Sequence, residues 1–383
     1  MERPSFSNPP LNEGIYMETK MKTQHSNQLV NSPRTGWLMA LPASAIVFTF
    51  IILPFLLGLY FSFTNQRFIS PNPAEYVGTS NFSQLLSLNI ISLEPERDPT
   101  SDIVKKADDG SLVYPALRSF TRNNPKYPQY NGMQEWFSWT SGNVKKIVLA
   151  SDVVFMRAIV NTFEFVFVVA PLQGGLALLL ALMINQKLPG INIFRTIYFM
   201  PVVVSIVVVS LLWRFIYNGD NGLLNGILSF FTFGAFKPID WLGNPFTALP
   251  AIMAMSIWQA VGFHMVIWLS GLQTIPATLY EAADIEGASN WQKFRFVTWP
   301  GLRNTAVLVL VVITMQAFTL FAQVQVMTNG GPRDATQSIV FQALDHGYGK
   351  QDIATGSAIS VILFLIVISI SLVQRYLTGD KSA

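Results

Sequence analysis

The sequence predicts an all-α polytopic membrane protein that crosses the bilayer six times. Of its 383 residues 51% are hydrophobic and only 12% are charged, whereas an ordinary soluble domain carries about 25% charged residues. Mean hydropathy is +0.38. Apolar runs recur along the chain, and a helix of about 20 apolar residues crosses the roughly 30 Å hydrocarbon core of a bilayer. An integral membrane protein follows from these three observations.

The six predicted spans are long enough to cross and carry few charges. They are residues 37–63, 158–185, 195–217, 246–273, 302–324 and 355–377. The first is too long and too far from the N-terminus for a cleaved signal. Prolines inside the spans are tolerated in a membrane, because neighbouring helices satisfy the carbonyls they free. Residues 158–377 therefore form the predicted transmembrane core.

Three segments lie outside the predicted spans. Residues 1–36 are rich in Asn, Ser, Pro and Thr without an apolar period, so we expect a disordered tail. Residues 378–383 form a short second tail. The insert at 64–157 is charged and Pro-rich, and no part of it could cross a bilayer. A floppy loop and a small folded lobe both remain open for this insert, and its aromatic content favours the lobe.

The short loops differ in charge, and this difference predicts orientation. On one side they carry most of the basic residues, which are Arg3, Lys20, Lys22, Arg34, Lys187, Arg195, Lys293, Arg295, Arg303, Arg375 and Lys381. The opposite short loops carry Lys237, Arg333 and Lys350. Because basic loops stay in the cytoplasm, we expect both termini there, and the insert outside.

The composition argues against several functions. A net charge of +3 without a basic patch gives no reason to expect nucleic-acid binding. The chain has no cysteine, and its three histidines, His25, His264 and His346, lie far apart, so we expect no metal centre. No Gly-x-x-x-x-Gly-Lys-Ser/Thr motif is present, so the chain should not bind ATP by itself. We therefore expect no cofactor and no catalytic site in this chain.

A polar stretch interrupts the apolar pattern between the fourth and fifth spans. Glu281 and Asp284 lie on one face of a short helix that Ala282 and Ala283 keep slim. Gly287 can supply the positive φ that ends this helix. Ser289 or Asn290 could cap a second helix, which Pro300 separates from the next span. Such a pair suits either a groove on a partner protein or the membrane surface, and the residues alone leave both open.

The same residues resemble a known motif. Glu281-Ala282-Ala283, Gly287, Val297 and Pro300 are similar to the EAA loop of binding-protein-dependent ABC importer permeases. The segments 271–276 and 328–332 resemble the carbohydrate-importing members, and the resemblance covers residues 37–377. Val297, Trp299 and Ala322 depart from the usual Ile, Leu and Asp of the family.

The resemblance implies the ABC type I importer fold and a set of partners. The loop at 276–300 would couple to a cytoplasmic ATPase dimer, which binds the ATP and Mg. The coupling residues would be Glu281, Ala282, Ala283, Asp284, Gly287, Ala288 and Pro300. A second permease, usually a different chain, would complete the path for a carbohydrate across a bacterial or archaeal plasma membrane. The chain would not be an enzyme by itself.

The position of the insert implies one more partner. It lies where the larger membrane subunit of maltose importers carries the domain that holds the extracytoplasmic solute-binding protein. By this resemblance of position we expect a docking lobe, with Trp136, Phe137 and Trp139 as candidate contacts.

Polar side chains deep in the spans are candidates for the substrate path. By helical rise His264 lies near the midplane, and Ser205 and Gln316 lie at mid to outer depth. Phe263, Trp258 and Phe318 lie nearby in sequence, and aromatic faces suit the apolar faces of sugar rings. A plain interhelical hydrogen bond remains the alternative role for His264 and Gln316.

The same hydropathy pattern is compatible with two other functions. A self-sufficient secondary transporter would normally carry intramembrane carboxylates or inverted repeats, and Glu164 is the only acid within a predicted span. A membrane-embedded hydrolase would need a nucleophile and base pair that this chain lacks. Both rivals predict activity from the chain alone. The sequence does not specify which carbohydrate is carried.

Overall fold

A computed structural model describes residues 33–98, 104–108, 110–186 and 190–378. It divides into two compact units, one ending at Tyr60 and one beginning at Phe61, and each is described by itself. Of the two predicted tails, residues 1–32 and 379–383 lie outside the described residues. The helix that follows the first tail begins at Pro33, a few residues before the predicted start of the span.

The described part of the first unit is one apolar helical run, whose last residue, Phe61, begins the second unit. It consists of α2 (Pro33–Val47), the π-turn η1 (Phe48–Ile52) and α3 (Leu53–Phe61). Its residues Gly36–Phe61 are apolar and long enough to cross a membrane. The π-turn lies directly before Pro54, whose ring removes a backbone N–H and so favours a local change in the hydrogen-bond pattern.

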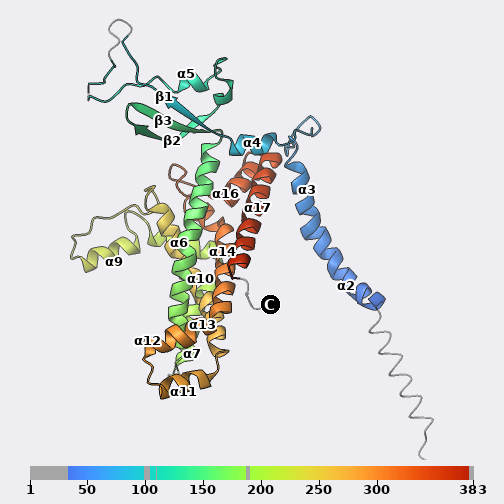
Figure 1. Ribbon diagram of the computed structural model, residues 1–383, viewed down its shortest axis with the longest axis vertical. Helices are drawn as coiled ribbons and strands as arrows, with labels where there is room; N and C mark the ends of the chain where they lie inside the picture. The colour runs from blue at the N-terminus through green and yellow to red at the C-terminus, as the bar shows by residue number, and fades with distance from the viewer. Residues whose placement is uncertain (1–32, 99–103, 109, 187–189, 379–383) are drawn as a thin grey trace, which may run out of the picture. The chain divides into compact units, whose positions relative to one another are not determined.

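The second unit is a helical bundle around one apolar core. Its long helices are α6 (Val153–Ile184), α10 (Ala248–Gln273), α14 (Arg303–Phe318) and α17 (Ile353–Thr378), and Figure 1 shows them running along the bundle. Small residues such as Ala177 and Ala181 on α6 are fully buried. The indole Nε1 of Trp268 on α10 donates to the carbonyl of Gly174, 3.1 Å away, which ties α10 to α6.

The third predicted span is broken instead of straight. It consists of α7 (Ile191–Val203) and α8 (Ile206–Ile216), which meet at 97°. Pro201 lies just before the break, and a proline removes a helical hydrogen bond. The α7 backbone also packs tightly on α10. A Cβ at position 262 would clash with the carbonyl oxygen of Tyr198, so only glycine fits there. Four helices are long and apolar enough to cross a membrane, or up to six if each bent pair is one span, among the residues described.

The fifth predicted span ends earlier than the sequence indicated. Helix α14 stops at Phe318, where the Thr319 hydroxyl donates to the Gln316 carbonyl at 2.8 Å. A separate helix, α15 (Ala322–Met327), follows. The chain then passes through α16 (Ile339–Leu344) and the π-turn η4 (Asp345–Gly349) into α17.

Part of the insert is a small lobe built on an antiparallel sheet. Its strands are β1 (Leu88–Leu93), β2 (Gln134–Ser141) and β3 (Val144–Ala150), in the order β1-β3-β2. Short helices α4 (Ser80–Leu86), α5 (Arg118–Thr121) and η2 (Pro128–Tyr130) accompany it. Ile147 and Leu149 lie in a core with Ile91 on one face of the sheet. The segment has enough aromatic and aliphatic side chains to bury one face of three strands.

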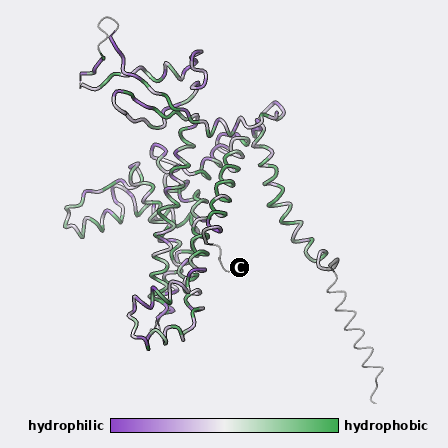
Figure 2. Tube along the Cα trace, in the orientation of Figure 1, coloured by the Kyte–Doolittle hydropathy of each residue, from purple (hydrophilic) through white to green (hydrophobic). Residues whose placement is uncertain are grey.

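Hydropathy separates the parts of the second unit. Figure 2 shows hydrophobic residues along α6 and α17, and hydrophilic residues concentrated in the lobe and at the opposite end of the bundle. That opposite end carries the polar stretch between α10 and α14. The two polar ends are therefore separated by the apolar helices.

Candidate functional site

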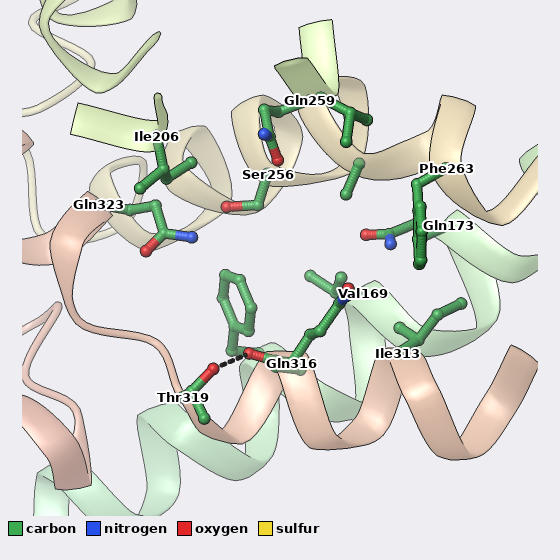
Figure 3. Close-up of a pocket in the computed structure, with 14 residues that line it drawn as sticks. Val169, Gln173, Ile206, Ser256, Gln259, Phe263, Ile313, Gln316, Thr319 and Gln323 are labelled. Atoms are coloured by element: carbon green, nitrogen blue, oxygen red, sulfur yellow. Dashed lines mark hydrogen bonds between the residues drawn. The ribbon is translucent and has the colours of Figure 1, made fainter. Parts of the chain in front are cut away.

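A cavity of about 320 Å³ lies inside the bundle, between α6, α8, α10 and α14. Its walls are Phe165, Val169, Gln173, Val202, Ile206, Ser256, Gln259, Ala260, Phe263, Ile313, Gln316, Ala317, Thr319 and Gln323. The broken span matters here, since both of its halves reach the cavity. Figure 3 shows the labelled side chains from several helices pointing around one space.

Amide side chains dominate the polar part of the wall. Gln173, Gln259, Gln316 and Gln323 all line the cavity, and Figure 3 shows them on different sides of it. Ser256 adds a hydroxyl whose Oγ is buried and has no hydrogen-bond partner within the described part of the chain. A buried polar atom of this kind is stabilised when a ligand or water supplies the missing bond.

One of these amides is held in place by a histidine. Gln173 is only 3% exposed, and its Nε2 lies 2.8 Å from Nδ1 of His264. The same Nδ1 lies 3.0 Å from the carbonyl oxygen of Ala260, one turn earlier on α10. His264 is fully buried and is not among the lining residues. It therefore supports the wall from behind.

The cavity combines aromatic faces with neutral donors and acceptors. Phe165 and Phe263 contribute rings, and none of the lining residues, all within the described ranges, has an ionisable side chain. A charged ligand would find no counter-charge in this low-dielectric site. A neutral ligand with many hydroxyl groups would find several hydrogen-bonding partners.

The six residues predicted for the path divide into three groups. Gln316 and Phe263 line the cavity, and His264 contacts it through Gln173. The structure does not bring Ser205, Trp258 or Phe318 to its wall.

Helix phase and the break explain why those three residues lie elsewhere. Ser205 is exposed at the N-cap of α8, where the chain turns. Trp258 packs on Trp213, with ring centroids 5.4 Å apart. Phe318 is buried edge-on against Phe163 at 5.6 Å. Phe318 is two residues from Gln316, which places it on the other side of the helix.

Sequence reasoning missed three of the four glutamines. Gln173, Gln259 and Gln323 line the cavity but were not predicted as path residues. A signal was present for Gln173 and Gln259, because polar side chains within long apolar spans are functional by default. Gln323 lies in α15, beyond the end of α14 at Phe318. Counting residues along a straight fifth span therefore gives no correct position for this side chain.

The polar stretch after α10 forms a helix with a defined stop. Helix α11 (Ala277–Ile285) ends in a Schellman motif: the N–H of Ala288 donates to the Ala283 carbonyl at 2.9 Å, and that of Gly287 to the Asp284 carbonyl at 3.1 Å. Gly287 has φ +70°, the left-handed conformation that favours glycine. The predicted glycine turn is confirmed.

A second helix packs back on the first. Ser289 caps α12 (Asn290–Lys293) in a reciprocal capping box with Gln292. The π-turn η3 (Phe294–Thr298) and α13 (Trp299–Gly301), which contains Pro300, follow. Asp284 forms an ion pair with Lys293, and the Tyr280 hydroxyl lies 2.9 Å from Thr298 Oγ1. These contacts hold the two helices as one unit, residues 276–300, which we call the coupling loop after the role that the sequence resemblance implies.

The coupling loop presents an apolar and acidic surface. Glu281, Ala282 and Asp284 are exposed, while Ala283 and Ala288 are half-buried. Large apolar side chains stand out on the same short helices, namely Ile285 (87% exposed), Trp291 (69%) and Phe296 (74%). Exposed apolar side chains rimmed by charges are typical of a contact surface for another protein or for a membrane.

The lobe exposes apolar side chains on its uncovered face. Phe137 pairs with Val148 across the sheet, and Val148 with Ile90, so all three share the face opposite the lobe core. Phe137 and Trp139 are 48% and 42% exposed, and their rings stack at 5.7 Å. Trp136 is half-buried at an irregularity in the strand pairing.

A titratable cluster lies at the turn before α17. His346 Nε2 is 3.0 Å from Lys350 Nζ, and Lys350 also pairs with Asp345 at 3.1 Å. Burial lowers the pKa of the His346 imidazole, and the Lys350 ammonium lowers that pKa further, against the opposing effect of the nearby carboxylates of Asp152, Asp352 and Asp345. The imidazole is therefore neutral near pH 7.

The fold and these surfaces define a class: a helical membrane protein with a neutral, polar cavity in its bundle and polar surfaces at both ends. Residues 173–380, more than half of the chain, match the family described as binding-protein-dependent transport system inner membrane component. The chain belongs to that family.

Curated relatives and solved structures agree with this assignment. The chain is 37% identical over 212 residues to the trehalose/maltose transport system permease protein MalF of Thermococcus litoralis, covering 55% of this chain and 70% of that protein. It is 31% identical over 274 residues to the lactose transport system permease protein LacF of Rhizobium radiobacter, covering 70% and 89%.

One solved structure matches almost the whole chain. It is a bacterial ABC transporter involved in the import of the acidic polysaccharide alginate, with a TM-score of 0.65 and 18% identity, covering 95% of this chain and 100% of the matched chain. At that identity the match shows a shared fold. The chain therefore shares its fold with a chain of that ABC transporter.

Proposed function

We propose that this chain is the transmembrane permease subunit of an ATP-driven, binding-protein-dependent importer for a neutral saccharide. The observation that carries the proposal is the cavity, which has four glutamine side chains and two phenyl rings in its wall and no ionisable group among the lining residues described. Hydroxyl groups of a sugar match amide donors and acceptors, and the apolar faces of its rings match aromatic side chains.

The relatives support saccharides as the cargo class. Those most similar in sequence include permeases named for trehalose/maltose, lactose and arabinooligosaccharides. The structurally similar alginate importer handles an acidic polysaccharide, and only the fold is shared with it. The neutral wall of the cavity favours an uncharged saccharide for this chain, because an ion without a counter-charge is costly to desolvate.

The proposed topology has six spans with both termini in the cytoplasm. In it each bent helix pair counts as one span, and the basic loops face inward. The coupling loop then lies in the cytoplasm and the lobe outside. This arrangement fits an inner-membrane component of a transport system, in a bacterial or archaeal plasma membrane.

The coupling loop is proposed to seat on a cytoplasmic ATPase dimer, which binds ATP and Mg. Glu281 would meet a basic group there, since a carboxylate and a partner Arg or Lys form charge-assisted hydrogen bonds. Ala282 would permit close approach, and Ile285, at 87% exposed, would fill an apolar pocket of the partner. Asp284 is paired with Lys293 within the loop, so we assign it to holding the loop together.

The uncovered face of the lobe is proposed to dock the solute-binding protein. The stacked rings of Phe137 and Trp139 supply the rigid aromatic surface that protein interfaces favour. A second permease subunit would complete the translocation path.

A selectivity measurement tests the cargo class. The chain is reconstituted in vesicles with its second permease, ATPase and binding protein, and uptake is compared for neutral disaccharides and for uronate oligosaccharides of equal length. The proposal predicts uptake of a neutral saccharide and none of the uronates. Preferential uptake of the charged series would contradict it.

Replacing one cavity glutamine links the selectivity to this site. Gln316→Ala should raise the apparent KM of the neutral saccharide about tenfold, since one lost hydrogen bond is worth about 1 kcal/mol or somewhat more. The matched control is Gln84→Ala on α4, an exposed glutamine outside the cavity. Equal behaviour of the two variants would remove the cavity from the proposal.

A further inference from the structure

The loop between α8 and α10 carries a short helix that exposes large apolar side chains and buries an asparagine. Helix α9 (Leu223–Phe231) is nine residues long, and its one fully buried side chain is polar. Asn225 is 3% exposed. Its Nδ2 lies 2.9 Å from the carbonyl oxygens of Gly219 and Ile239, and its Oδ1 accepts from the indole Nε1 of Trp241 at 2.8 Å.

These contacts fix how α9 is rotated. The Asn225 amide forms hydrogen bonds with the chain both before and after α9, at Gly219 and Ile239, and so holds the two ends of the loop together. Asn225 therefore faces inward. The opposite side of α9 is the side that faces away from the protein.

That outward side is apolar. Leu223, Ile227, Phe230 and Phe231 follow the spacing i, i+4, i+7 and i+8, which places them on one helix face. They are 60%, 43%, 78% and 73% exposed, and Phe233 just beyond the helix is 98% exposed. In water such a face would forfeit about 25 cal/mol for each Å² of apolar surface left exposed. A buried polar anchor on the inner side and an exposed apolar outer side suit an apolar surrounding.

The position of α9 indicates what that surrounding is. Its loop connects two membrane-crossing segments. Phe215 near the end of α8 and Phe246 shortly before α10 are 74% and 87% exposed. Figure 1 shows α9 lying crosswise to α6, at the level of the middle part of α6 and well below its lobe end. The apolar face of α9 thus continues the apolar surface of the spans.

We infer that α9 and the turn through Phe233 form an interfacial helix, whose phenyl rings insert among the acyl chains of the leaflet on the lobe side of the bilayer. Amphipathic helices lie in this way, with one face in the boundary between headgroups and acyl chains. The inference depends on the chain being embedded in a bilayer and not on its cargo. The helix would fix the height and tilt of the adjacent broken span, α7–α8, whose halves reach the cavity.

The natural absence of cysteine makes a direct test simple. Phe231→Cys gives the full-length chain a single thiol for a nitroxide label, and the exposed position keeps the core intact. The labelled chain, reconstituted in phosphatidylcholine–phosphatidylglycerol vesicles, is measured for collision with oxygen, which concentrates in lipid, and with a water-soluble nickel chelate. The matched control is Asp220→Cys, an exposed polar position in the same loop.

The inference predicts that the label at 231 collides with oxygen severalfold more often than with the nickel chelate, and that the control shows the reverse order. Ready access of the nickel chelate to position 231 would place the helix in water. Protection from both reagents would place it against protein, either the first unit of this chain or another subunit. Either of the last two results overturns the inference.

Discussion

The amide of Gln173 on α6 lies 2.8 Å from the ring nitrogen Nδ1 of His264 on α10. Both side chains are almost completely buried, and the pair connects two helices behind the wall of the cavity. Gln173 also lines the cavity. His264 is thus a positioning residue, because it reaches the cavity through Gln173.

This relationship predicts a binding defect in a His264 variant. His264→Leu leaves the Gln173 amide without its partner, and an unsatisfied buried group costs about 1–3 kcal/mol. We expect an apparent KM for saccharide uptake raised about tenfold or more, with a smaller change in kcat, measured in reconstituted vesicles. His264→Asn, whose amide can still bond Gln173, should recover part of the loss. Equal defects in the two variants would contradict the positioning role.

The backbone conformation of Gly287 predicts how strongly different substitutions at position 287 reduce activity. Its φ of +70° is excluded for proline and strained for alanine, while asparagine tolerates it better. A Cβ there meets nothing within 4 Å, so the expected cost of alanine is backbone strain of roughly 1–2 kcal/mol.

Transport-coupled ATP hydrolysis should therefore fall in the order Gly, Asn, Ala, Pro at position 287. The measurement is binding-protein-stimulated ATPase activity of the assembled complex. Membrane insertion should be unchanged in every variant. A proline variant with full activity would show that the turn has no part in coupling.

The uncovered face of the lobe predicts a docking defect. Phe137→Ser with Trp139→Ser removes two stacked rings without touching the lobe core, so stimulation by the binding protein should drop severalfold while basal ATP hydrolysis stays constant. Thr140→Ala on the same strand is the control. Deleting residues 95–145 would be a less specific change, because it would remove all of β2 and with it the sheet. Unchanged stimulation in the double variant would exclude this face as the docking site.

The lowered pKa of His346 predicts a loss of stability in mild acid. The unfolded chain has a histidine pKa of about 6.5, and burial and Lys350 set the folded pKa below that value. Below about pH 6.5 the unfolded state binds more protons, so the free energy of unfolding falls as the pH drops towards the folded pKa. Above about pH 7 His346 does not contribute to the pH dependence of the free energy of unfolding.

Hydrogen exchange of residues 345–352 measures this effect between about pH 7 and pH 5. Protection should decrease towards acid pH in the wild-type chain, after correction for intrinsic rates. In His346→Gln this decrease should be smaller. An identical pH dependence in both chains would contradict the assignment to His346.

Sequence patterns were sufficient for the helical class and for the turn in the coupling loop. Length and hydropathy located each apolar segment, and the Gly287 turn and the Ser289 cap follow from local backbone preferences that act over a few residues. Such local signals do not depend on the rest of the fold.

The cavity wall was harder to predict because it depends on tertiary geometry. The right-angle break after Val203 turned Ser205 away, and the early end of α14 placed Gln323 in a separate helix. Depth counted along a straight helix gives neither result. Hydrophobicity also gives no rotational phase for helices that are apolar all round, so it could not show that Trp258 packs on Trp213 and does not line the cavity.

Accumulation of a radiolabelled neutral saccharide by vesicles, with and without the partner ATPase and ATP, distinguishes a permease subunit from a transporter that works alone. We expect accumulation only when this chain, its second permease, the ATPase, the binding protein and ATP are all present, and none by the chain alone. Accumulation by the purified chain without ATP would contradict this expectation and favour a self-sufficient secondary transporter.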